Sequence, residues 1–184
     1  MIRVAHSEGV NIYCPENGRF SFFNSPYFAH QSCTGVDIYP DAWFNNAAPS
    51  PVSGEIIGIR EVNRFQHRDF ECSDKDYVIL IRSLENRDKT VKILHVKPTV
   101  KVGAKINVGE KIGILIRSGF FDFWTDPHIH VEVRNPEDPI RARGGCRIKG
   151  TIEIDSDLDL VDLTSIKGTV VDSKREYSLI APEM

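Results

Sequence analysis

Two histidines separated by a single residue, His128 and His130, are the first feature of this sequence that could do chemistry. The segment His128-Ile-His-Val-Glu-Val-Arg134 alternates polar and apolar residues, which predicts a β-strand with both imidazoles on one face. Two imidazoles on the same face can reach a common metal ion or substrate. An H-x-H pair alone is weak evidence, because two partly exposed histidines on a polar sheet face give the same pattern.

A second group of metal-binding residue types lies earlier in the chain. His30, Cys33 and Asp37 fall within eight residues and offer an imidazole nitrogen, a thiolate sulfur and a carboxylate oxygen, all of which bind zinc. Each also has an ordinary structural explanation: Cys33 as a small buried apolar residue, His30 in a loop and Asp37 in a turn. His95 lies in a predicted strand, where a surface histidine is the ordinary interpretation.

These residues belong to an ordered series of short motifs. The series comprises Cys33-Thr-Gly-Val-Asp37, Pro51-Val-Ser-Gly54, Ile93-Leu-His95-Val, Val102-x6-Gly109-x2-Ile-Gly113 and Asp126-Pro-His128-Ile-His130-Val-Glu132. It resembles the lysostaphin-like zinc metallopeptidases, the glycyl-glycine endopeptidase family with the duplicated-hybrid-motif β fold. The likeness extends over about residues 28–140 and keeps the five motifs in the family's order.

The resemblance implies a role for each matching residue. Asp37 and His130 would be zinc ligands, and His95 and His128 would flank a metal-bound water. One of these two histidines would act as general base and the other would stabilise the tetrahedral intermediate. Three protein ligands leave a fourth position for water, and an imidazole exchanges protons near neutral pH. The implied protein is a zinc-dependent endopeptidase with one divalent ion and a peptide or protein substrate.

The third ligand departs from the family pattern. Cys33 stands where the family has its first histidine, and His30 lies three residues earlier. Along a strand, residues four apart share a face, whereas residues seven apart do not unless a bulge intervenes. We therefore expect Cys33 to be the third ligand, with His30 as the alternative.

Two other functions remain open at this stage. The cysteine favours a catalytically degenerate family member that binds a peptide or partner protein without cutting it, whereas retention of both His95 and His128 opposes this hypothesis. Sugar-phosphotransfer proteins share the β architecture and carry phosphate on a histidine. They lack the aspartate and H-x-H metal set, which argues against that function here.

An aromatic segment, Phe120-Phe-Asp-Phe-Trp124, directly precedes the H-x-H motif. We expect Phe123 and Trp124 to line a substrate groove, because so many aromatic residues rarely lie free in a solvent-exposed loop. The alternative is that they pack against residues 150–184.

The elements that must position these residues are strands. Apolar β-branched runs predict strands at residues 55–60, 77–82 and 90–96, with a hairpin turn at 85–89, and glycines 103, 109 and 113 predict turns with positive φ. No segment shows a sustained helical period. The predicted fold is all-β, with an antiparallel lysostaphin-like sandwich or barrel-like core.

We expect three regions along the chain. Residues 1–27 would pack on the core, residues 28–145 would form the metallopeptidase domain, and residues 146–184 would form a small β extension. Short strands are predicted in the extension at 147–154, 168–171 and 177–180. Eight acidic and three basic residues between 151 and 184 make this extension acidic.

Composition excludes several function classes. With 184 residues and a net charge of −3, the chain gives no electrostatic reason to expect nucleic acid. It contains no apolar run of about 18 residues, so no membrane span is expected. The start of the chain has no apolar leader, so we expect a cytoplasmic protein with four reduced cysteines. The basic residues Arg134, Arg141, Arg143, Arg147 and Lys149 are predicted to form a solvated charged face.

Overall fold

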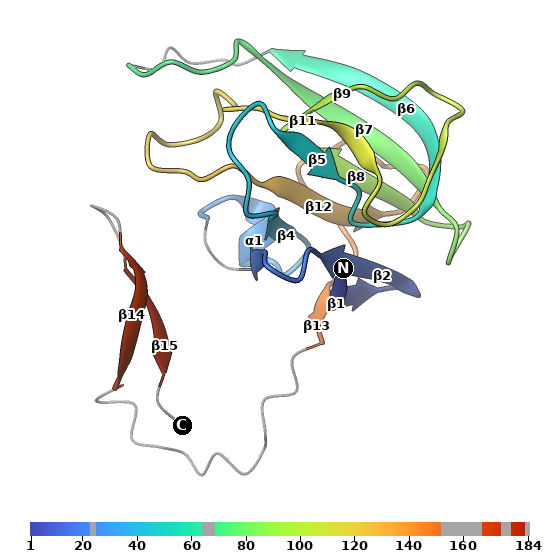
Figure 1. Ribbon diagram of the computed structural model, residues 1–184. Coiled ribbons are helices and arrows are strands. Elements are labelled where there is room, and N and C mark those ends of the chain that lie inside the picture. The colour runs from blue at the N-terminus through green and yellow to red at the C-terminus, as the bar shows by residue number, and fades with distance from the viewer. Residues whose placement is uncertain (23–24, 64–68, 152–166, 174–177, 183–184) are drawn as a thin grey trace.

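The computed structural model describes residues 1–22, 25–63, 69–151, 167–173 and 178–182, and the regular secondary structure of these residues is almost entirely β-strand (Figure 1). The single helix among them, α1, is the four-residue segment Phe28–Gln31. Every strand pair is antiparallel. The predicted all-β antiparallel fold is therefore confirmed.

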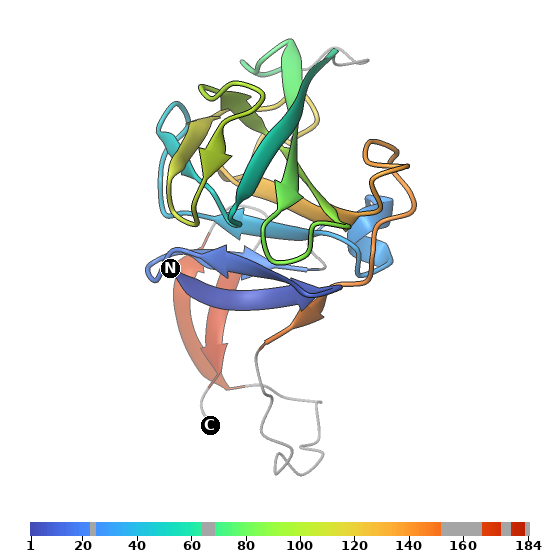
Figure 2. The ribbon, with the colours of Figure 1, turned by 90° about the vertical axis from the view of Figure 1, so that its right-hand side faces the viewer.

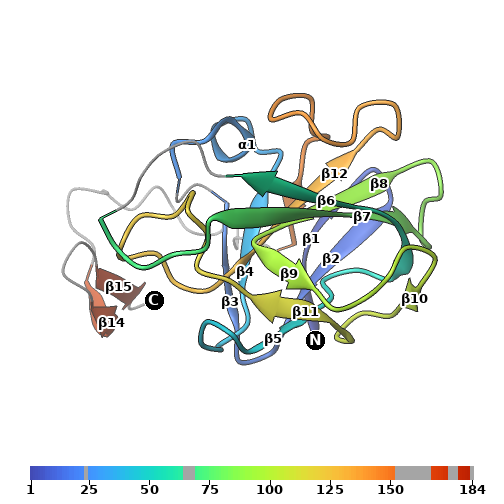
Figure 3. The same cartoon turned by 90° about the horizontal axis from the view of Figure 1, so that it is seen from above.

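A curled seven-stranded sheet forms the centre of the molecule (Figure 3). Its strands, in spatial order, are β10 (Lys105–Ile106), β6 (Gly54–Asn63), β7 (Lys75–Ser83), β8 (Thr90–Leu94), β12 (Ile129–Arg134), β4 (Val36–Tyr39) and β3 (Arg19–Ser21). The strands predicted at 55–60, 77–82 and 128–134 correspond to β6, β7 and β12. The predicted hairpin turn joins β7 to β8.

Three smaller sheets accompany the central one. One has the order β13 (Lys149–Gly150), β1 (Ile2–Ser7) and β2 (Val10–Cys14), and lies beneath the central sheet in Figure 2. Another has the order β5 (Ala47–Pro49), β11 (Lys111–Leu115) and β9 (Val96–Pro98). The last is a hairpin of β14 (Gly168–Ser173) and β15 (Ser178–Pro182).

The hydrophobic core lies against one face of the central sheet. Ile129, Val131 and Val133 of β12 are fully buried in a cluster that also includes Val4 and Ile12 from the β1–β2 sheet. Burying such side chains stabilises the fold by roughly 1.5–3 kcal/mol each. The opposite, polar face of β12 is buried as well, because it forms the floor of a cleft.

The structure corrects three local predictions. Gly113 has no positive φ and lies within β11, where a Cβ atom would be 2.3 Å from the carbonyl oxygen of Lys97; it permits a close strand approach rather than a turn. The strand predicted at 90–96 is interrupted at His95, whose φ is 68°. Arg134 is fully buried and ion-paired to Glu132, so it belongs to no solvated face.

Among the described residues of the strand predicted at 147–154, only Lys149–Gly150 form a strand, β13. β13 pairs with β1, and β14 and β15 match the strands predicted near 168–171 and 177–180. Residues 152–154 and Tyr177, also predicted as strand, lie outside the described residues. All four cysteines are free thiols. In the described part of the chain, no helix has the length and hydrophobicity needed to cross a membrane.

The central position of β8 generates a stability prediction. Ile93 lies in β8 between β7 and β12 and is fully buried, whereas Leu84 is 48% exposed after β7. We expect Ile93→Ala to lower the free energy of unfolding by about 2–5 kcal/mol, because it leaves a cavity in the core. Leu84→Ala should cost less than about 1 kcal/mol. Urea denaturation of both variants measures the difference, and equal losses would place the core elsewhere.

Candidate metal centre

Strand register brings the first two site residues together. Asp37 of β4 and His130 of β12 are directly opposite each other across an antiparallel pair. Their side chains therefore share the cleft face of the sheet. The Nδ1 atom of His130 lies 2.8 Å from Oδ1 of Asp37, and both residues are buried.

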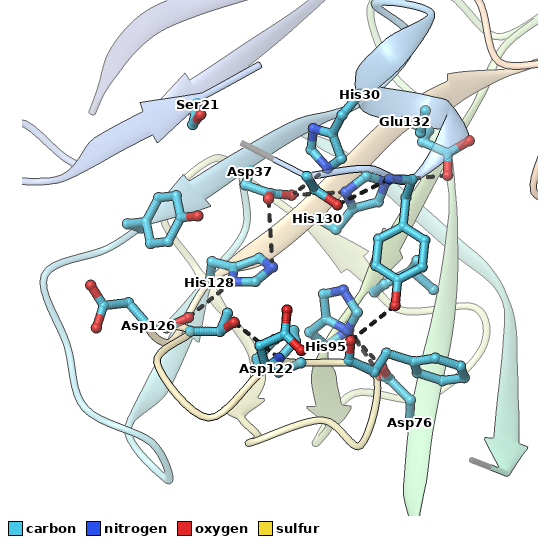
Figure 4. A pocket seen from close by; sticks show the side chains of 18 of the residues that line it. Ser21, His30, Asp37, Asp76, His95, Asp122, Asp126, His128, His130 and Glu132 are labelled. Carbon is cyan, nitrogen blue, oxygen red and sulfur yellow. Dashed lines mark hydrogen bonds and ion pairs between the residues drawn. The ribbon is translucent and has the colours of Figure 1, made fainter. Parts of the chain in front are cut away.

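The third member of the cluster is His30, on helix α1. Its Nε2 atom lies 3.3 Å from Oδ1 of Asp37, and its ring packs edge-on against that of His130. One ligand atom from each of His30, Asp37 and His130 lies within 4.8 Å of the others. Figure 4 shows the three side chains converging on one point of the cleft.

Cys33, the expected third ligand, is not part of this cluster. Cys33 lies in a turn after α1 with φ 57°, and no group of potential metal ligands among the described residues includes it. The two-residue alternation that argued against His30 does not apply, because the chain from Phe28 to Gln31 is helical rather than extended. The helix and turn place His30 on the Asp37 side instead.

Gly35 allows this segment to approach His130 closely. A Cβ atom at Gly35 would lie 2.7 Å from Cε1 of His130 and 3.0 Å from Cβ of Ala29. Such distances are below van der Waals contact, so any larger residue would push α1 or the imidazole out of place.

Hydrogen bonds fix both imidazoles through their second ring nitrogen. The Nδ1–H of His30 donates to the carbonyl oxygen of Phe22 at 2.9 Å, which leaves Nε2 toward Asp37. The Nε2–H of His130 donates to Oε1 of Glu132 at 3.2 Å, which leaves Nδ1 toward Asp37. Partners of this kind orient histidine ligands in metalloproteins, where their loss costs about 10–100-fold in metal affinity or activity.

Glu132 belongs to a buried charge network that sequence reasoning missed. Its carboxylate accepts hydrogen bonds from Nζ of Lys92 at 2.7 Å and from Nη1 of Arg134 at 2.8 Å. Burial alone would raise the pKa of Glu132, but the contacts with His130 and Lys92 lower it to about 2. The alternation in residues 128–134 placed Glu132 on the histidine face but gave no indication of its partners.

The charges of the cluster suit a divalent cation. Burial opposes ionisation of Asp37, but the surrounding His128, His130 and His30 outweigh it and hold its pKa well below the ordinary value. Burial also opposes protonation of His130, yet Asp37 and Glu132 raise its pKa to about 9. A cation bound here would replace the proton on His130 as the partner of Asp37.

The two other predicted site histidines lie beside the cluster and are not part of it. His128 Nε2 is 3.7 Å from Oδ2 of Asp37, and its Nδ1–H donates to the carbonyl oxygen of Asp126 at 2.9 Å. Burial lowers the pKa of His128 to about 4. The ring centroid of His95 lies 5.0 Å from that of His128 and 6.1 Å from that of His130.

The cluster lies in a cleft of about 840 Å³ whose walls are largely apolar. Trp124 lines the cleft, whereas Phe123 does not line it and is 47% exposed. Neither side chain is fully buried, since Trp124 is 37% exposed. The aromatic residue nearest the histidines is Phe121, which stacks on His128 with a centroid distance of 4.5 Å and meets His95 edge-on at 4.6 Å.

Comparison with known proteins identifies the family. A family model described as "Domain of unknown function (DUF8155) N-terminal domain" matches residues 10–150, so the chain belongs to this family. A search of curated proteins found no match to this chain. A crystal structure of a mutant catalytic domain of the prophage-encoded M23 protein EnpA from Enterococcus faecalis is similar at 20% identity and a TM-score of 0.39. That match covers 61% of this chain and 72% of the other. A likeness at this level assigns neither an activity nor a ligand.

The cluster geometry predicts how two substitutions affect metal content. His30→Ala removes one of the three clustered donors, so zinc should be lost on gel filtration in chelator-treated buffer. Cys33→Ala should retain zinc close to the wild-type ratio, because its thiol lies outside the cluster. Metal analysis by mass spectrometry measures both ratios. Zinc lost from Cys33→Ala and kept by His30→Ala would reverse the assignment.

Proposed function

We propose that this protein is a zinc-dependent peptide hydrolase. The observation that carries the proposal is the buried His30, Asp37 and His130 cluster, flanked by His95 and His128 in a cleft. Two imidazoles and one carboxylate form a donor set typical of catalytic zinc, where three protein ligands leave a position open. A structural zinc site would instead use four protein ligands.

The donor atoms fit one divalent ion. His30 offers Nε2, His130 offers Nδ1 and Asp37 offers a carboxylate oxygen, and the other ring nitrogen of each histidine is already bonded. When bound, such an ion supplies Lewis acidity toward a carbonyl oxygen and makes water a better nucleophile near neutral pH. The protein's own groups supply hydrogen-bonded imidazoles and a buried carboxylate.

His95 and His128 are the residues suited to move protons. Neither belongs to the donor cluster, and each has its Nδ1 committed to a protein oxygen: Asp76 for His95 and the Asp126 backbone for His128. The Nε2 atom of each ring is thereby the one available for exchange with a substrate or water. Positioned acid–base groups of this kind contribute about 10²–10⁴-fold to a rate.

The cleft supports a peptide substrate. Its volume of about 840 Å³ falls within the usual range for ligand sites, and the apolar lining can hold side chains while a few polar groups face the scissile bond. Cleft walls come from the α1 region on one side and from the loop before β12 on the other. An extended peptide lying between them would cross the cluster.

The main rival is a degenerate protein that binds a peptide without cutting it. The feature that favoured this rival was the cysteine in place of the expected histidine ligand. Because His30 supplies an imidazole at that side of Asp37, the cysteine no longer argues for a damaged site. No specific observation now favours a pure binding function.

Substitution of the flanking histidines tests the proposal. The zinc-loaded protein should cleave members of a pool of fluorescence-quenched hexapeptides with a randomised central pair. We expect His95→Ala and His128→Ala each to lower turnover by at least about 10²-fold while zinc content stays near the wild-type value.

His6→Ala provides the matched control, because His6 lies in β1 and does not line the cleft. It should leave turnover unchanged. Zinc loss from His95→Ala would contradict the role assigned to His95. Absence of cleavage across the whole pool by zinc-loaded wild-type protein would favour the binding function.

A further inference from the structure

Asp76 is a buried carboxylate that the hydrolysis described above does not yet use. It begins the buried part of β7, is 2% exposed and lines the cleft next to His95. Its Oδ2 atom lies 2.5 Å from Nδ1 of His95, and its Oδ1 atom accepts the backbone N–H of the same residue at 3.0 Å. One carboxylate thus holds both the ring and the main chain of His95.

The carboxylate is itself fixed by two further hydrogen bonds. The backbone N–H of Tyr77 donates to Oδ1 at 2.6 Å, and the hydroxyl of Ser118 donates to Oδ2 at 2.6 Å. Ser118 is fully buried, so its hydroxyl serves the carboxylate and is not a nucleophile facing the cleft. Burial opposes ionisation, but His95 and these donors lower the pKa of Asp76 to about 2.

The backbone at His95 needs this support. His95 is the one residue between β8 and β9, and its φ of 68° is in the left-handed region that non-glycine residues rarely adopt. Such conformations persist only where surrounding contacts hold them, and they concentrate at functional sites. The turn breaks the strand alternation and leaves the ring between Asp76 and the other cleft histidines (Figure 4).

We infer that Asp76 is a positioning residue that holds His95 as the proton carrier of the cleft. This inference rests on the proposed hydrolysis. Asp76 keeps the proton of the neutral ring on Nδ1, so Nε2 faces away from the carboxylate with a free electron pair. Ser118 keeps the carboxylate in place.

The same bond separates the roles of the two flanking histidines. The Nδ1 atom of His95 is hydrogen-bonded to the carboxylate of Asp76, whereas that of His128 is hydrogen-bonded to the neutral backbone carbonyl of Asp126. A carboxylate stabilises the imidazolium that forms when a proton arrives, as in other aspartate–histidine pairs.

In the proposed reaction, Nε2 of His95 takes a proton from the attacking water as the water oxygen bonds to the carbonyl carbon. The same proton then passes to the amine nitrogen as the C–N bond breaks.

The Asp76→Asn variant tests this role with little change in shape. An amide oxygen can still accept the two backbone N–H groups, but the NH₂ group can only donate toward His95. The ring must then accept at Nδ1 and carry its proton on Nε2. We expect kcat to fall by about 10²–10⁴-fold with KM within a few-fold of wild type. Zinc content should not change, because Asp76 is outside the donor cluster.

A spectroscopic measurement separates positioning from general damage. Long-range ¹H–¹⁵N correlation spectra should show a protonated Nδ1 in neutral His95 of the wild type and a protonated Nε2 in Asp76→Asn. Ser118→Ala should lower kcat less than Asp76→Asn and retain the wild-type tautomer. Asp88→Asn, an exposed turn carboxylate after β7, is the control and should alter neither property.

Failure of the proposed hydrolysis and failure of the positioning role of Asp76 give different results. If zinc-loaded wild-type protein cleaves no peptide, the proposed hydrolysis fails, and the His95 tautomer alone decides whether Asp76 positions the ring. An unchanged tautomer in folded Asp76→Asn would overturn the inference, as would an unchanged kcat. If Asp76→Asn does not fold, an Nε2–H tautomer in wild-type His95 would overturn it equally.

Discussion

The antiparallel register between β4 and β12 is the constraint on which the candidate site depends. It places Asp37 opposite His130, and with β8 on the other side of β12 it brings the strand break at His95 to the same level of the sheet. A slip of one residue would turn Asp37 or His130 into the core. The register is held by Val36, Ile38, Ile129 and Val131, whose side chains are buried on the opposite face. The core and the site therefore specify the same alignment.

The site also depends on buried charged side chains that are paired with one another. Asp37, Asp76 and Glu132 are three carboxylates that lie almost entirely out of water, and each is matched by a histidine. Unpaired, each would be costly to bury, whereas paired and hydrogen-bonded they fix the imidazoles in defined tautomers. Lys92 and Arg134 complete this arrangement at Glu132, beneath His130. The side chains of the cleft floor are thus held by several hydrogen bonds each, as catalytic or metal-binding sites require.

The sequence predicted those parts of the structure that depend on local periodicity. Alternation in residues 128–134 and the β-branched runs of β7 and β8 identified the central strands and placed His130 on the polar face. The four-residue helix α1 was not predicted because it is too short to show a helical period. This helix places His30 beside Asp37, and Cys33 lies outside the cluster. The partners of the histidines were also missed. Asp76, Ser118 and Lys92 come from separate elements, and only the folded chain brings them to His95 and Glu132.

We propose that His30, Asp37 and His130 hold one zinc ion, and X-ray absorption at the zinc edge of the metal-loaded protein would identify the atoms bound to it. We expect only nitrogen and oxygen atoms around the zinc, at about 2.0–2.2 Å, with two of the nitrogen atoms from imidazoles. A sulfur scatterer at about 2.3 Å would contradict it, because that distance requires a cysteine ligand. A spectrum of fully hydrated zinc with no imidazole contribution would contradict it equally.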